Sequence, residues 1–148
     1  MALDLPGLQQ AIADLAESPG ATVADCAQAW ADAMRDYASG VVPVSASVDA
    51  AAATLAGALA TAFSSPAAAP GMEVAFATFA ATVAVGMTAG GWAGVPPTSP
   101  AGFATQFAGA MPQTHAQAGQ QIGALIDTWM KTGAATLIAP PNTPVTWT

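Results

Sequence analysis

The chain has 148 residues, of which 53% are hydrophobic and only 7% are charged, and nine acidic against two basic side chains give a net charge of −7. Binding to nucleic acid or to an anionic membrane surface depends on clustered Lys and Arg, so we expect neither as a partner. The length fits one domain, and the charged fraction lies far below the usual value of about 25%, which is atypical of a free monomer.

Turn signals divide the chain into six predicted helices with large apolar residues at three-to-four spacing. The first begins near Asp4 and ends before the SPG sequence at 18–20. The second opens with Thr22 and Asp25 at the spacing of a capping box and ends near Gly40. The N-terminal sequence MALDLPGLQQ lacks the basic region of a secretory signal, so we expect the protein to be made and kept in a cytoplasm.

The middle of the chain predicts two further helices, over residues 47–63 and 71–88. The second of these carries a long apolar stripe on one side and Val74 and Val85 on the other. A helix that is apolar on both sides is typical of the centre of a bundle. We therefore expect residues 71–88 to be surrounded by the other helices.

The last third predicts a short helix that begins with Ser99 as cap and Pro100 as first residue, and a longer one over 114–132 that stops at Gly133. Strand signals are weak, because the best candidate, VVPVSASV at 41–48, contains a proline and serines. The predicted fold is therefore all-α, a compact bundle of about six helices.

No group of residues in the sequence predicts catalysis or metal binding. His115 is the only histidine and Cys26 the only cysteine, while Asp32 and Asp36 lie with Arg35 on what we expect to be a solvated helix face. Nucleophilic, acid–base and metal chemistry each require a cluster of such groups. We expect no enzyme activity, no cofactor and no metal.

The C-terminal residues 134–148 differ in character from the helical domain predicted over 1–133. Three prolines favour an extended arm, and its apolar side chains are candidate anchors. The arm packs either on its own bundle or on a neighbouring chain, where a tryptophan is a typical dominant contact. Together with the loop tryptophan of GGWAGVPP, the candidate partner-contact residues are Trp92, Leu137, Ile138, Val145 and Trp147.

Residues 74–95 are uncharged and long enough to cross a bilayer, which leaves a membrane-active protein as an alternative. The segment is rich in Ala, Gly and Thr, has no flanking Lys or Arg, and is interrupted at Gly90 and Gly91, so a buried helix fits better. A small binding module is a further alternative, with a ligand pocket lined by Met72, Phe76, Phe79 and Met87.

The segments QAWADAMRDYASGVVP, GWAGVPPTSPAGF and ALIDTWMKTGAAT resemble small, Ala-rich structural proteins of tailed bacteriophages and of phage-tail-like particles. The resemblance implies a virion component of the neck, tail or baseplate, present in several symmetric copies and assembled in the host cytoplasm. It implies no catalytic or binding residue. Our hypothesis is a non-enzymatic structural subunit, homo-oligomeric and in contact with other structural proteins of the same assembly.

Overall fold

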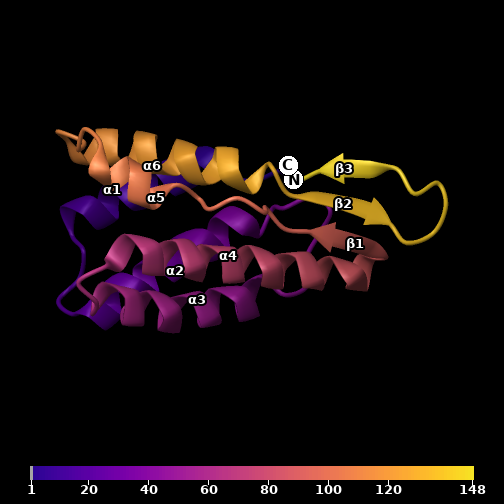
Figure 1. Ribbon diagram of the computed structural model, residues 1–148, viewed down its shortest axis with the longest axis horizontal. Coiled ribbons are helices and arrows are strands. Elements are labelled where there is room, and N and C mark those ends of the chain that lie inside the picture. The colour runs from indigo at the N-terminus through magenta and orange to yellow at the C-terminus, as the bar shows by residue number, and fades with distance from the viewer. Residues whose placement is uncertain (1) are drawn as a thin grey trace.

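The structure, a computed structural model, describes residues 2–148 as a helical bundle with a small sheet at one end (Figure 1). The helices run along the long axis of the molecule, and the hairpin of the last two strands forms its narrow end. The elements are α1 (Leu5–Glu17), α2 (Val23–Ala38), α3 (Val48–Phe63), α4 (Ala68–Gly86), the 3₁₀ helix η1 (Met87–Gly90), β1 (Trp92–Val95), α5 (Phe103–Ala108), α6 (His115–Met130), β2 (Ala134–Leu137) and β3 (Pro144–Thr146).

The helix caps read from the sequence are mostly confirmed. At the start of α2, Thr22 accepts a hydrogen bond from the backbone of Asp25, and the Asp25 carboxylate accepts one from the backbone of Thr22, which completes the capping box. Thr114 caps α6 by accepting a bond from the backbone N–H of Gln117 at 3.1 Å. These short polar side chains satisfy N–H groups that have no partner inside the helix.

The predicted start of α5 is wrong. The helix begins at Phe103 and not at Ser99 or Pro100, because the preceding residues are held in a non-helical path. The indole N–H of Trp129 donates to the Ser99 carbonyl at 2.7 Å, which fixes this segment to α6. The chain turns into the helix only at Gly102, whose φ of +93° favours glycine.

The predicted central position of α4 is also wrong. Within the bundle α1 packs on α6 and α2, α2 packs on α3, and α3 packs on α4, while α5 and β1 cover another part of α4. On the remaining side of α4 the described part of the chain leaves side chains exposed. Val74 and Val85 lie on that side, 68% and 67% exposed, although two apolar sides had predicted complete burial.

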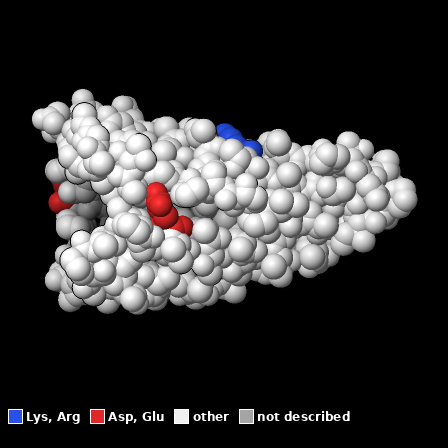
Figure 2. Space-filling view, viewed as in Figure 1, with Lys and Arg blue, Asp and Glu red and all other residues white. Residues whose placement is uncertain are grey.

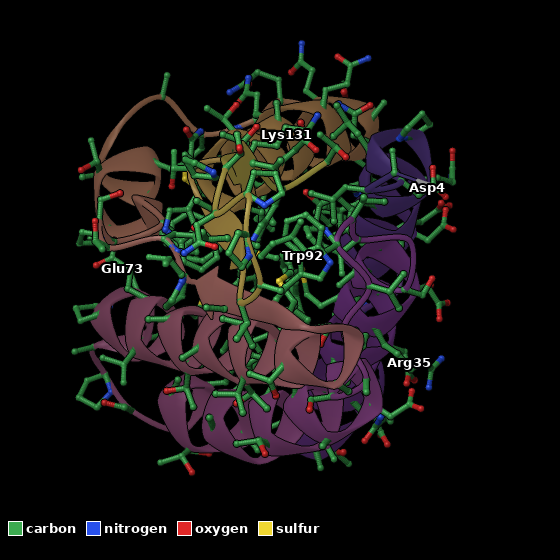
Figure 3. All side chains as sticks on the ribbon, turned by 90° about the vertical axis from the view of Figure 1, so that its right-hand side faces the viewer. Asp4, Arg35, Glu73, Trp92 and Lys131 are labelled. Atoms are coloured by element: carbon green, nitrogen blue, oxygen red, sulfur yellow. The ribbon has the colours of Figure 1, made fainter. Side chains whose placement is uncertain are left out.

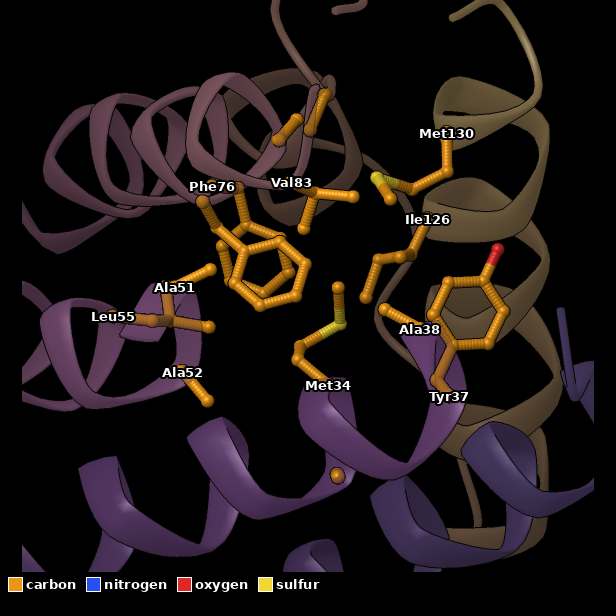
Figure 4. Packing of buried hydrophobic residues seen from close by; sticks show 14 of the residues in the cluster. Met34, Tyr37, Ala38, Ala51, Ala52, Leu55, Phe76, Val83, Ile126 and Met130 are labelled. Atoms are coloured by element: carbon orange, nitrogen blue, oxygen red, sulfur yellow. The ribbon is translucent and has the colours of Figure 1, made fainter. Parts of the chain in front are cut away.

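The core is closed by aromatic rings contributed by four helices. The Phe76 ring of α4 lies 4.8 Å from that of Phe103 in α5, 6.1 Å from that of Trp30 in α2 and 6.4 Å from that of Trp129 in α6, measured between centroids. Aliphatic and methionine side chains fill the space around these rings, with Met34, Ile126 and others turned toward a common centre in Figure 4. One continuous core thus joins both halves of the chain.

Helices α1 and α6 pack closely because glycine occupies the contact. A Cβ added at Gly119 would overlap the carbonyl oxygen of Gln9 and lie 3.1 Å from the Cβ of Ala13. Gly123, one turn further along α6, faces Gln9 in the same way. The absence or small size of the side chains at Gly119, Gly123 and Ala13 therefore sets the distance between these helices.

The sheet is the feature that an all-α prediction misses. Its strands are antiparallel in the order β1-β2-β3, with Trp92 opposite Leu137 and Ala135 opposite Val145. Residues 41–48, the weak strand candidate that the sequence argued against, do not form a strand. Val42 nevertheless exchanges two backbone hydrogen bonds with Thr148 and so lies beside the end of the chain. Strands of three or four residues are too short to show an alternating pattern.

Two glycine substitutions test the role of glycine in the α1–α6 contact. Gly119→Ala forces a shift of α1 and should lower the free energy of unfolding by about 1–3 kcal/mol. At Gly57 on α3, an alanine methyl group would meet no other atom within 4 Å, so Gly57→Ala should raise it by about 0.5–1 kcal/mol. Urea unfolding measures both values, and equal changes in the two variants would contradict the account.

Candidate functional site

The first candidate is a buried polar group between α2 and α6. The Tyr37 hydroxyl donates to one carboxylate oxygen of Asp127 at 3.0 Å, and the Lys131 ammonium donates to the other at 2.8 Å. Asp127 is only 7% exposed and Tyr37 only 1%. Both oxygens of the carboxylate therefore have partners, and the group links two helices that are far apart in sequence.

Burial, followed by the negative charge of Asp127, raises the pKa of the Tyr37 hydroxyl well above its ordinary value. Tyr37 consequently keeps its proton into the alkaline range, where an ordinary tyrosine ionises, and acts as a hydrogen-bond donor. An acid–base role would need a substrate within reach, and the two carboxylate oxygens are already used by Tyr37 and Lys131. The arrangement fits a structural link between α2 and α6.

An acidic residue in a helix ordinarily lies on an exposed face, and Asp127 is an exception. A signal for its burial was present, because Asp127 lies between the buried Ile126 and Trp129 of α6, and Lys131 follows at the four-residue spacing of a helical ion pair. The sequence could not show that Tyr37 meets it across 90 positions.

The remaining titratable groups lie at the surface or are partly buried. Arg35 forms exposed ion pairs with Asp32 and Asp36, as a solvated helix face predicts. Cys26 is partly buried, and this burial raises the pKa of its thiol. Across residues 2–148, no three His, Cys, Asp or Glu side chains come together in a way that could hold a metal ion.

His115, at the start of α6, is exposed and borders two surface hollows of about 390 and 300 Å³. The larger lies between α1 and α6 and is also lined by Gln10, Asp14 and Glu17. In that hollow Gln10 donates to Asp14 at 2.7 Å. The four residues proposed for a ligand pocket are no more than 4% exposed and belong to the core: Met72, Phe76, Phe79 and Met87.

The C-terminal arm packs on its own chain. Trp147 is 0% exposed, its indole N–H donates to the Ala134 carbonyl at 3.0 Å, and its backbone N–H donates to that of Gly133. Its ring lies where a Cβ of Gly133 would be, so only glycine fits there. Of the two arrangements that the sequence left open, the structure has the first, and Trp147 is a core residue instead of a contact to a neighbour.

The other four predicted contact residues lie in or beside the sheet. Trp92 and Leu137 face each other across β1 and β2 and are half-buried. Ile138, just after β2, is 61% exposed, and Val145 in β3 is 37% exposed. The structure thus brings these residues to one end of the molecule but leaves Ile138 as the most exposed of the five.

A second apolar surface lies on α4, the helix that was predicted to be surrounded by the others. We call it the α4 face, and it is a shallow hollow of about 630 Å³ lined by Val74, Ala77, Thr78, Ala81, Thr82 and Val85. Figure 2 shows the molecule from the side of α4, and most of this side carries neither acidic nor basic groups. Among the described residues, Val74 and Val85 are two of the most exposed large apolar side chains.

Comparisons with protein-family models, with curated proteins and with solved structures found no match to this chain.

Substitution of Trp147 and of Ile138 should affect the stability of the isolated protein to very different extents. Trp147→Ala removes a buried indole and should lower the free energy of unfolding by about 3–5 kcal/mol. Ile138→Ala, at an exposed position, should change it by less than about 0.5 kcal/mol. Thermal and urea unfolding measure both, and a Trp147→Ala protein as stable as the wild type would contradict the burial of the arm.

The raised pKa of Tyr37 predicts a loss of stability at high pH. In the unfolded chain Tyr37 ionises near its ordinary pKa of 10.0, whereas the folded chain keeps the proton, so the native state binds more protons above that pH. The free energy of unfolding should therefore fall above pH 10, relative to Tyr37→Phe, by up to about 1.4 kcal/mol per pH unit. Parallel curves for the two proteins from pH 9 to pH 11.5 would contradict this assignment.

Proposed function

We propose that this chain is a non-enzymatic structural subunit of a phage or phage-tail-like particle, working through protein–protein contacts. The observation that carries the proposal is the α4 face, an uncharged apolar surface on a folded helix with Val74 and Val85 more than 60% exposed. Exposed apolar surface of this kind is typical of protein–protein contact sites.

The distribution of charge supports the same proposal. Between residues 50 and 126 Glu73 is the only Asp, Glu, Lys or Arg, so α3, which adds Asp49, and α4, β1 and α5 form their surfaces almost without charge. The centre of a protein interface is depleted in charged residues in the same way, whereas a surface that is always exposed to solvent normally carries them. The resemblance of three segments to small phage structural proteins points to a virion as the assembly.

A membrane-active protein is the competing proposal. Residues 68–90 form a helical stretch of 23 residues that is long and apolar enough to cross a membrane. Its most apolar 18-residue window has a mean hydropathy of 1.5, and half of that window is buried in the bundle. Insertion of α4 would separate Phe76 from the rings of Trp30, Phe103 and Trp129. The packed core therefore favours the structural subunit.

Incorporation into particles tests the proposal. We expect the wild-type chain to copurify with particles at a fixed number of copies when it is expressed with the other structural proteins. Val74→Asp/Val85→Asp places unpaired carboxylates in the contact and should weaken it by roughly 2 kcal/mol or more, about 30-fold in affinity. Thr54→Asp, on the exposed side of α3, is the control and should be incorporated normally.

Both variants must keep the wild-type circular dichroism and unfolding temperature for the comparison to hold. Equal incorporation of the double variant and the wild type would show that the α4 face makes no contact in the particle. Recovery of the wild-type chain in a membrane fraction that resists carbonate washing would contradict the structural role and favour the membrane-active alternative.

A further inference from the structure

The α4 face has the spacing of a helix–helix contact. Its central positions Val74, Thr78, Ala81 and Val85 follow one another at intervals of four, three and four residues, which keeps them on one line along the helix. Among residues 2–148 no element covers that line, and Val74 and Val85 at its two ends are 68% and 67% exposed. A second helix that packs along this line would cross α4 at the shallow angle of about 20° seen in helical bundles.

The polar groups of the α4 face already have partners. The Thr78 hydroxyl donates to the Val74 carbonyl at 3.0 Å, and the Thr82 hydroxyl donates to the Thr78 carbonyl at 2.9 Å. Covering the face with protein therefore removes water without leaving a hydroxyl donor unpaired, which would otherwise cost about 1–3 kcal/mol. What the face presents to a partner is mainly methyl groups.

The order of residues on the α4 face has valine at both ends and alternates alanine with threonine between them. Read in sequence it is Val, Ala, Thr, Ala, Thr, Val, so a two-fold axis perpendicular to the helix at its midpoint places each valine beside the valine of the other copy. The same axis places Thr78 of one copy beside Ala81 of the other, a larger side chain beside a smaller one. The face is complementary to itself in the antiparallel direction, as an isologous contact requires.

The positions of the charged side chains are compatible with a second copy as the partner. Asp4 and Arg35 lie on the side of α1 and α2, away from the side on which Glu73 and α4 lie (Figure 3). The nearest acid in sequence, Glu73, accepts a hydrogen bond from the backbone of Ala104 in α5 at 3.1 Å. A contact confined to the α4 face would therefore bury no charged side chain, because none lines that face.

We propose that the α4 face binds the same face of a second copy of this chain, with the two α4 helices antiparallel and Val74 of each beside Val85 of the other. The contact forms a two-fold dimer, the unit from which a symmetric assembly is built. The inference rests on the proposed function in that both use the α4 face, but it names the partner and can be tested in the purified protein alone.

Cysteine cross-linking tests the pairing and its direction. In a Cys26→Ser background, Val74→Cys chains are mixed with Val85→Cys chains of a different tagged length and exposed to mild oxidation. The antiparallel dimer brings positions 74 and 85 together, whereas two copies of position 74 lie 11 residues apart along the axis, about 16 Å. A disulfide needs Cα atoms within about 7 Å, so the mixture should cross-link at least tenfold faster than either protein alone.

A charge in the middle of the α4 face supplies the specificity control. Ala81→Glu, added to both cysteine proteins, should abolish the cross-link, because it places one carboxylate from each copy near the axis, in the middle of an apolar contact. Thr54→Glu on the exposed side of α3 should leave the cross-link unchanged. Cross-linking of Val74→Cys with itself, no cross-link in the mixture, or a cross-link that survives Ala81→Glu would each overturn the proposal.

The two proposals can fail separately. A chain that is incorporated into particles through α4 but forms no cross-link in solution would use that face for a different protein, and the dimer would be rejected while the structural role stood. A cross-linked dimer that enters no particle would keep the dimer and reject the role in a virion.

Discussion

The burial of Trp147 against Gly133 is the interaction on which one whole end of the molecule depends. The ring is fully enclosed, and its indole and backbone N–H groups both bond to carbonyls at the start of β2. The next residue, Thr148, then reaches back to pair with Val42 near the start of α3. The last residues therefore hold the sheet together and attach it to the bundle, which takes Trp147 out of contact with other molecules. The exposed apolar side chains that remain include those of the α4 face and Ile138.

The scarcity of charge shapes both the interior and the surface. Inside, the single acidic side chain that is buried among the described residues, Asp127, has both oxygens paired, so it joins α2 to α6 without an unsatisfied group. Outside, the absence of charge from most of residues 50–126 leaves the α4 face with nothing but apolar groups and self-bonded threonines. The same composition permits close packing within the chain and between chains. In both cases few charged or unpaired polar groups have to lose their water.

Local signals predicted the parts of this structure that local physics determines. The capping box of Thr22 and Asp25, the cap at Thr114 and the boundaries of most helices follow from hydrogen bonds within four residues, so the sequence shows them. The sheet does not, because its pairing of Trp92 with Leu137 joins residues 45 positions apart through strands too short for a pattern. The position of α4 was predicted wrongly for a related reason. A helix with valines on two sides shows that both sides avoid water, but not whether the second is covered by its own chain or by another.

The central claim is that the apolar side of α4 is an intermolecular surface that lies open in the single chain. Sedimentation equilibrium of the wild-type protein, from low micromolar to millimolar concentration, tests this most directly. We predict a mass that rises with concentration from the 14.5 kDa of one chain toward twice that value. A mass that stays at 14.5 kDa over the whole range would contradict the self-association through α4.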